Sequence, residues 1–172
     1  QGYNNPYYFA PAAAPYHEII TPFQRSFQVE IGKNNAKYFD ANGWLYFTKE
    51  RFDLFYPSYG DTYPTYNGAI GMTFEQAGNS SSSSAIITNT GDTLTLKERI
   101  EHHYTTTIGT LEAVSKNTGK LLSAFKKFFD DAKASGVGEY KTFVVADAAN
   151  KIASLTILLE ANNIQYSYSS GA

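Results

Sequence analysis

The most constraining feature of the chain is a tyrosine- and glycine-rich stretch, residues 56–68, that leads directly into a short apolar segment, residues 69–74. Two prolines and two glycines in the first part oppose regular structure, so this loop needs support from the rest of the fold. The apolar segment is typical of a buried strand and ends on one carboxylate, Glu75. A carboxylate in that position can serve as a rigidly held general base. The alternative is that Glu75 simply marks where the strand meets water, as most acidic residues do.

The order of these motifs resembles the carboxypeptidase A-type zinc metallopeptidases. Residues 56–60 (Tyr-x-x-x-Gly) and 73–75 (Thr-Phe-Glu) are similar to the carboxy-terminal part of that catalytic domain, where a mobile loop tyrosine precedes a strand ending in Thr-Phe-Glu. Residues 47–55 and 96–104 resemble a bacterial, Bacteroidetes-like branch of the family. Residues 7–11 (Tyr-Tyr-Phe-Ala-Pro) resemble the segment that follows the third zinc ligand.

This resemblance covers about residues 1–130 and implies roles for individual side chains. Glu75 corresponds to the glutamate that acts on zinc-bound water as general base and then as general acid. Tyr56 corresponds to the loop tyrosine that donates a hydrogen bond to the scissile region. Tyr59 lies close enough to compete for that alignment, and the alternative for Tyr56 is a simple packing role. Tyr59, Asp61 and Tyr63 are the expected substrate-binding residues.

The zinc ligands of the family are missing from this sequence. The family uses a His-x-x-Glu pair and a later His, all upstream of the glutamate. His17-Glu18 has neither this spacing nor that of HExxH, and the adjacent helical residues His102 and His103 point about 100° apart. We expect His103 on a buried face and His102 in solvent. The resemblance implies that zinc belongs to the full-length protein, that this fragment binds none, and that it is inactive alone.

The predicted fold class is α/β: a partial three-layer α/β/α zinc-carboxypeptidase fold with a mixed sheet, followed by a truncated βαβ unit. Residues 1–136 are interpreted as the carboxy-terminal part of the peptidase-like domain. Residues 137–172 are interpreted as the start of a further module, with a strand at 139–145, a helix at 149–162 and a strand at 165–168.

Capping signals predict the two longest helices. Thr21 with Gln24, and Thr95 with Glu98, form capping-box patterns, and Gly43 supplies the residue that ends the first helix. A brief helix is predicted over residues 48–55, and a regular strand over 69–75. Helical spacing predicts that the buried face of the helix after Thr95 holds Leu96, Ile100, His103, Thr107, Leu111 and Val114.

Composition excludes several classes of function. The net charge of −2, with no basic stripe, gives no reason to expect nucleic acid. No apolar run approaches the roughly 18 residues of a membrane-spanning helix, and the absence of cysteine excludes disulfides and thiolate metal sites. The chain begins at Gln1 without a visible signal peptide, which favours a piece of a longer protein. A periplasmic or extracellular location is implied by the resemblance alone.

Three functional hypotheses follow. The first is a fragment of a zinc metallocarboxypeptidase, a secreted hydrolase acting on peptides. The second is a non-catalytic peptide- or glycan-binding module on a degenerate peptidase fold, for which the 14 tyrosines and 12 phenylalanines would supply an aromatic surface. The third is a plain structural α/β domain. Because an incomplete sheet would leave apolar side chains uncovered, we also expect self-association.

Overall fold

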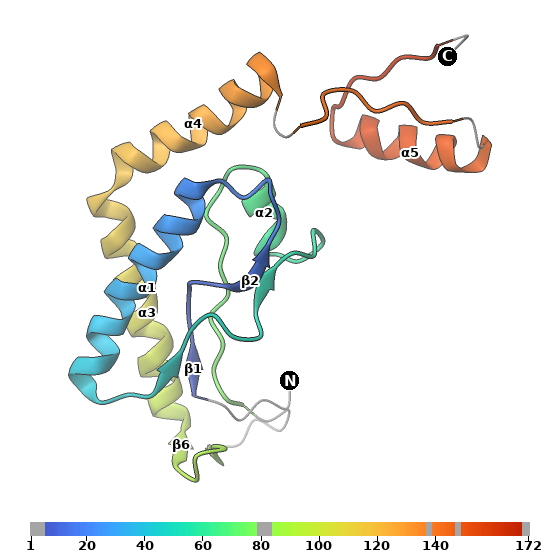
Figure 1. Ribbon diagram of the computed structural model, residues 1–172. Coiled ribbons are helices and arrows are strands. Elements are labelled where there is room, and N and C mark those ends of the chain that lie inside the picture. Colours follow the sequence, from blue (N-terminus) through green and yellow to red (C-terminus); the bar gives the residue numbers. More distant parts are fainter. Residues whose placement is uncertain (1–5, 79–83, 137–138, 147–148, 170–172) are drawn as a thin grey trace. The chain divides into compact units, whose positions relative to one another are not determined.

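The computed structural model describes residues 6–78, 84–136, 139–146 and 149–169 (Figure 1). The chain forms two compact units, residues 1–138 and residues 139–172. Helices predominate and the strands are short, so the chain belongs to the α/β class in its general sense. The three-layer peptidase arrangement and the identity of the two units stay predictions.

Within the described residues of the first unit, the strands form three separate two-stranded sheets. Two of the sheets are parallel and join the amino-terminal segment to residues some 40 positions later in the chain. The third is an antiparallel hairpin in which Ile86 lies opposite Leu94. The pairs are β1 (Tyr7–Tyr8) with β3 (Tyr46–Phe47), β2 (Ala13–Tyr16) with β4 (Asp53–Leu54), and β5 (Ala85–Ile87) with β6 (Thr93–Thr95).

The first long helix begins and ends where the sequence predicts. In α1 (Pro22–Asn42) the Thr21 hydroxyl accepts a hydrogen bond from the Gln24 N–H, and the Gln24 side chain accepts one from the Thr21 N–H. This reciprocal pairing satisfies donors that the first helical turn leaves without partners. At the other end Gly43 adopts φ 66°, a left-handed conformation that costs glycine little.

The second capping box is also confirmed, at the start of α3 (Leu96–Lys116). Asn117 separates this helix from α4 (Thr118–Ser135), and a shorter helix, α2 (Thr62–Tyr66), lies within the tyrosine-rich loop. In Figure 1, α1 and α3 run side by side, and hydrogen bonds between their side chains confirm the contact.

The aromatic core of this unit surrounds β1. Tyr7, Phe9 and Phe39 are fully buried, and Phe74 and Trp44 pack against them. The ring centroids of Tyr7 and Phe39 are 5.1 Å apart, within the range at which aromatic pairs stabilise a core. The amino-terminal strand is therefore held between α1 and the segment that precedes Glu75.

Two local predictions in this region are wrong. Residues 48–55 form no helix, because the Lys49 N–H bonds to the Pro11 carbonyl and the Phe52 carbonyl accepts from the Ala13 N–H. Tertiary pairing with the amino-terminal segment thus overrides the local helical preference. Residues 69–75 form no regular strand either; their only described bridge is an isolated antiparallel pair between Glu75 and Tyr8.

The predicted buried face of α3 is also wrong, and the error is systematic. The face that packs on α1 carries small or polar residues, and the predicted apolar residues are exposed. A Cβ atom on Gly109 would lie 2.3 Å from Asn35 Oδ1, so glycine permits the close approach of the two helices here. The residues of α3 that are buried are His102, Thr106, Gly109 and Ala113.

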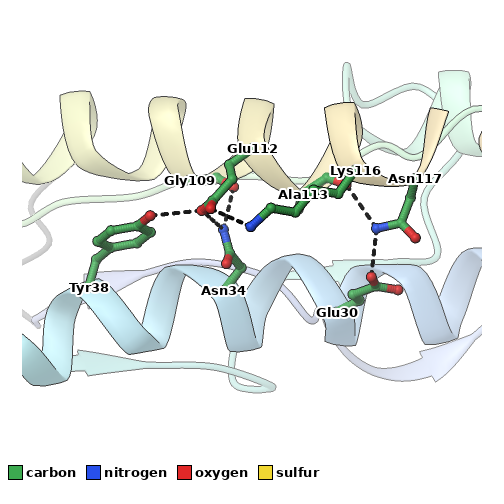
Figure 2. Close-up of polar contacts among 8 residues, drawn as sticks. All are labelled: Glu30, Asn34, Tyr38, Gly109, Glu112, Ala113, Lys116 and Asn117. Atoms are coloured by element: carbon green, nitrogen blue, oxygen red, sulfur yellow. Dashed lines mark hydrogen bonds and ion pairs between the residues drawn. The ribbon is translucent and has the colours of Figure 1, made fainter.

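Polar contacts hold this close approach together (Figure 2). Glu112 Oε2 accepts hydrogen bonds from Asn34 Nδ2 (2.9 Å) and the Tyr38 hydroxyl (2.7 Å), and its other oxygen pairs with Lys116. These three partners lower the pKa of Glu112 to about 2, with the Lys116 hydrogen bond the largest cause. One turn further along, Asn117 Nδ2 donates to Glu30 Oε1 at 2.7 Å.

The second unit has one confirmed element, α5 (Ala149–Ala161), close to the predicted helix. The two predicted strands are wrong, because residues 139–146 and 164–169 do not form strands. Phe143 and Val144 are 80% and 87% exposed, so the part of the second unit that the structure describes does not bury this apolar segment. A parallel pair requires a covered sheet, which explains why the predicted βαβ unit is not formed.

Candidate functional site

Glu75 is fixed through its backbone to the amino-terminal strand. Its N–H donates to the Tyr8 carbonyl at 3.1 Å, and its carbonyl accepts from the Tyr8 N–H at 2.7 Å. Residues that exchange both hydrogen bonds lie directly opposite each other, with their side chains on one face. Because successive side chains of an extended segment alternate, Phe74 lies on the other face, where it packs against the Tyr7 core.

The side chain of Glu75 is half-buried and has no hydrogen bond or ion pair with any residue that the structure describes. This sets it apart from the other half-buried carboxylates in the described ranges. Asp61 accepts from Thr73, Glu98 from the Thr95 cap, Glu101 pairs with Lys97, and Glu112 has three partners. Partly buried polar groups usually have partners. A carboxylate held without one keeps its oxygens available to a molecule that approaches it.

The predicted loop residues lie on exposed surface near α2. Tyr56, Tyr59 and Tyr63 are 56%, 60% and 55% exposed, and the rings of Tyr56 and Tyr59 meet edge to face at 5.1 Å. The structure brings neither Tyr56 nor Tyr59 into a described contact with Glu75.

Asp61 occupies a different position from the exposed tyrosines. Its Oδ2 accepts a hydrogen bond from the Thr73 hydroxyl at 2.5 Å, and its Oδ1 accepts from Thr62. Thr73 lies two residues before Glu75, so Asp61 ties the tyrosine-rich loop to the segment that carries Glu75. A role of Asp61 in substrate binding stays a prediction. The observed hydrogen bond holds the segment around Thr73 in place.

A cavity of about 490 Å³ lies between residues 76–78 and the first half of α3. None of the predicted site residues lines it. Alternation along the extended segment places the Gln76 side chain, which lines this cavity, on the face opposite Glu75. The cavity and the Glu75 carboxylate therefore belong to different faces of the same segment.

Sequence reasoning missed a polar network behind this segment. The fully buried Tyr7 hydroxyl lies 2.8 Å from both His103 Nδ1 and Thr106 Oγ1. Burial raises the pKa of Tyr7, and the hydrogen bond from Thr106 opposes the rise while the negative charge of Glu75 adds to it. Tyr7 therefore remains a neutral phenol within electrostatic reach of the Glu75 carboxylate.

His102 is the buried histidine of the pair, and His103 lies on the exposed face, which reverses the prediction. The His102 ring lies among Tyr7, Phe39 and Trp44, and its Nδ1 is 2.6 Å from Gln76 Oε1. Burial is the largest cause of its lowered pKa, so the ring is neutral at pH 7. The small residues Thr106, Gly109 and Ala113, spaced along one face of α3, were the available sequence signal for its burial.

No group of three or more histidine, aspartate or glutamate side chains in the described ranges is placed to hold a metal ion. His17 accepts a hydrogen bond from the Ile19 N–H and packs beside Phe55 and Tyr66. The donors that this part of the chain brings together do not fit a zinc site.

Comparison with family models, curated proteins and solved structures found no match to this chain. None of the helices in the described ranges combines the length and the apolar character needed to cross a bilayer.

Proposed function

We propose that this chain is the carboxy-terminal part of a zinc-dependent metallocarboxypeptidase domain in which Glu75 is the general base. The carboxylate would accept a proton from the attacking water and later return it to the leaving amine. One observation carries the proposal. The backbone N–H and carbonyl of Glu75 both form hydrogen bonds with Tyr8, yet its half-buried carboxylate has no partner among the described residues. The order Tyr56, Gly60, Thr73, Glu75 supplies the family resemblance.

The metal would be bound by residues outside this chain. The 172 residues contain no His-x-x-Glu pair, and the described residues bring no set of zinc ligands together. The chain by itself is therefore expected to hydrolyse no peptide and to bind no stoichiometric zinc. A peptide substrate, a periplasmic or extracellular location and self-association through exposed apolar surface belong to the same proposal.

The test uses the longest native polypeptide that contains this sequence, loaded with zinc, and peptides with free or blocked carboxyl ends. Glu75→Gln removes the base and keeps the shape, so we expect kcat to fall by about 1,000-fold with little change in KM. Glu101→Gln is the matched control, because Glu101 is also half-buried but is paired with Lys97 on the surface of α3. Equal turnover in the Glu75→Gln variant and the native enzyme would refute the assignment.

A second candidate function is supported by the exposed tyrosines of the loop. Tyr56, Tyr59 and Tyr63 present aromatic faces to solvent within eight residues, which suits a non-catalytic module that binds peptide or glycan. Calorimetric titration of the chain with oligosaccharides and with short peptides tests this. Binding that is lost in Tyr59→Ala and retained in Glu75→Gln, without any turnover by the native polypeptide, would favour the module over the enzyme.

A further inference from the structure

The outer face of α3 is apolar along the whole helix, although α3 packs on α1 through its opposite face. The exposed fractions of Ile100, Tyr104 and Leu111 are 60%, 67% and 58%. The positions of Ile100, Tyr104, Thr107, Leu111 and Val114 follow a spacing of four, three, four and three residues. In helix pairs, residues with this spacing form the seam along which the two helices contact each other.

The two halves of this face differ in shape. The cavity of about 490 Å³ lies over the first half of α3, where Leu96, Ile100, Tyr104 and Thr107 line it. The second half presents exposed apolar side chains, with Ile108 46% and Leu111 58% exposed. In a pair of α3 helices, the apolar side chains on the second half of one helix can fill the cavity over the first half of the other. This requires that the two helices run in opposite directions.

The spacing of positions 100, 104, 107 and 111 is also symmetric about the middle of α3. Counting outward from the point between residues 105 and 106, Tyr104 corresponds to Thr107, and Ile100 to Leu111. An antiparallel pair related by a two-fold axis would therefore place an aliphatic layer at each end and a Tyr–Thr layer at each side of the axis. This is the self-complementary pattern that a symmetric dimer requires.

We propose that two copies of this chain associate through the outer faces of α3, antiparallel about a two-fold axis near residues 105–106. Ile100 of each copy then packs on Leu111 of the other. The inference deepens the self-association part of the proposed function and is independent of the peptidase part.

The outer face carries exposed apolar side chains at Leu96, Ile100, Tyr104, Ile108 and Leu111. On α4, Leu122 and Phe125 line a separate hollow together with Phe23, Gly68 and Ile70, so they are not counted as part of this face. A standard interface buries roughly 800 Å² on each partner, and an aromatic side chain alone buries about 150–250 Å². Antiparallel pairing also sets the positive end of each helix dipole beside the negative end of the other.

Cysteine cross-linking tests the geometry directly, since the native sequence contains no cysteine. Ile100→Cys and Leu111→Cys chains are prepared separately and oxidised alone or after mixing. We expect a covalent dimer in the mixture and little in either variant alone. Efficient cross-linking of Ile100→Cys with itself would show a parallel pair or a two-fold axis near residue 100, and either would overturn the proposal.

A charge variant tests the energetics on the full chain. Leu111→Asp places two carboxylates in the apolar seam, so the dissociation constant measured by sedimentation is expected to rise about 100-fold or more. Leu45→Asp is the matched control, because Leu45 is the same residue with the same 58% exposure and lies outside α3. Circular dichroism checks that both variants fold.

Three outcomes would overturn the dimer. One is a native chain that stays monomeric at the highest soluble concentration, and another is equal weakening by Leu45→Asp and Leu111→Asp. The third is loss of the dimer in Glu75→Gln, because that residue lies on a different face. Loss of peptidase activity in Glu75→Gln with an unchanged dissociation constant would support both inferences separately.

Discussion

Two half-buried carboxylates of the first unit illustrate opposite uses of the same chemical group. Glu112, between α1 and α3, has Asn34, Tyr38 and Lys116 as partners, and its pKa falls to about 2. Glu75 is held just as firmly through its backbone, but its carboxylate has no partner in the described residues. A carboxylate whose oxygens are occupied contributes to stability, whereas one with open oxygens is available for chemistry. We call the contact between α1 and α3 around Glu112 the support region. We call the segment around Glu75 the candidate reactive region.

The largest effect expected from this comparison is on turnover. In the zinc-loaded longer polypeptide, Glu75→Gln should lower kcat by about 1,000-fold and leave Tm unchanged, because the carboxylate has no hydrogen bond or ion pair with the described residues. Glu112→Gln should leave kcat unchanged. Kinetic assays and calorimetry on the same two preparations measure both quantities. A similar fall in Tm for both variants would remove the distinction between the regions.

The support region should be most sensitive at Gly109. Gly109→Val places its Cβ 2.3 Å from Asn35 Oδ1, so α1 and α3 must move apart. We expect a loss of about 3 kcal/mol in the free energy of unfolding, the upper range for overpacking. Urea unfolding measures this loss. Gly60→Val is the control, because no atom lies within 4 Å of the corresponding position; an equal loss there would contradict the close-packing explanation.

His102 connects the two regions, because its ring contacts Phe39 of α1 and bonds Gln76 next to Glu75. Burial lowers its folded-state pKa below the ordinary value of 6.5. The unfolded chain therefore binds a proton more readily, and this group lowers stability as the pH falls through 6.5 toward the lower folded pKa. His102→Phe should flatten the dependence of Tm on pH between 7 and 5. An unchanged slope would show that the ring is solvated.

The smallest effect is expected at acidic pH from Glu112. Its pKa is depressed from 4.5 to about 2 in the folded state, so its stabilising contribution is complete above pH 4.5 and is lost as the pH falls toward 2. Glu112→Gln should lower Tm by only a few degrees at pH 7, because the group is near solvent, and should remove part of the acid dependence. Thermal unfolding from pH 7 to pH 2 tests this.

Local signals in the sequence predicted the helix boundaries well. Thr21 with Gln24 and Thr95 with Glu98 form their hydrogen bonds within four residues, so the information needed to place these caps is contained in the segment itself. Gly43 ends α1 for the same reason, since only its own backbone conformation is involved.

The predictions for residues 48–55 and for the buried face of α3 were wrong because contacts between distant parts of the chain decide these features. Residues 48–55 resembled a helix, but their backbone groups pair with the segment around Pro11 and Ala13. The α3 prediction assumed that the apolar stripe faces inward, and the structure buries Gly109 and Ala113 instead. The same assumption exchanged the roles of His102 and His103. Which face of a helix is buried depends on the element that packs against it. The apolar residues of the helix do not by themselves identify that element.

For the candidate site, the sequence alone identified Glu75 and the tyrosine-rich loop before it, because a lone carboxylate after an apolar segment is visible in the order of residues. Only the tertiary structure decided that the backbone of Glu75 pairs with Tyr8 and that Asp61 bonds Thr73. It also decided that the Glu75 carboxylate has no partner among the residues that the structure describes. The physical reason is separation along the chain. Caps and turns are set by neighbours a few residues away, whereas the environment of Glu75 is assembled from a strand 67 positions earlier.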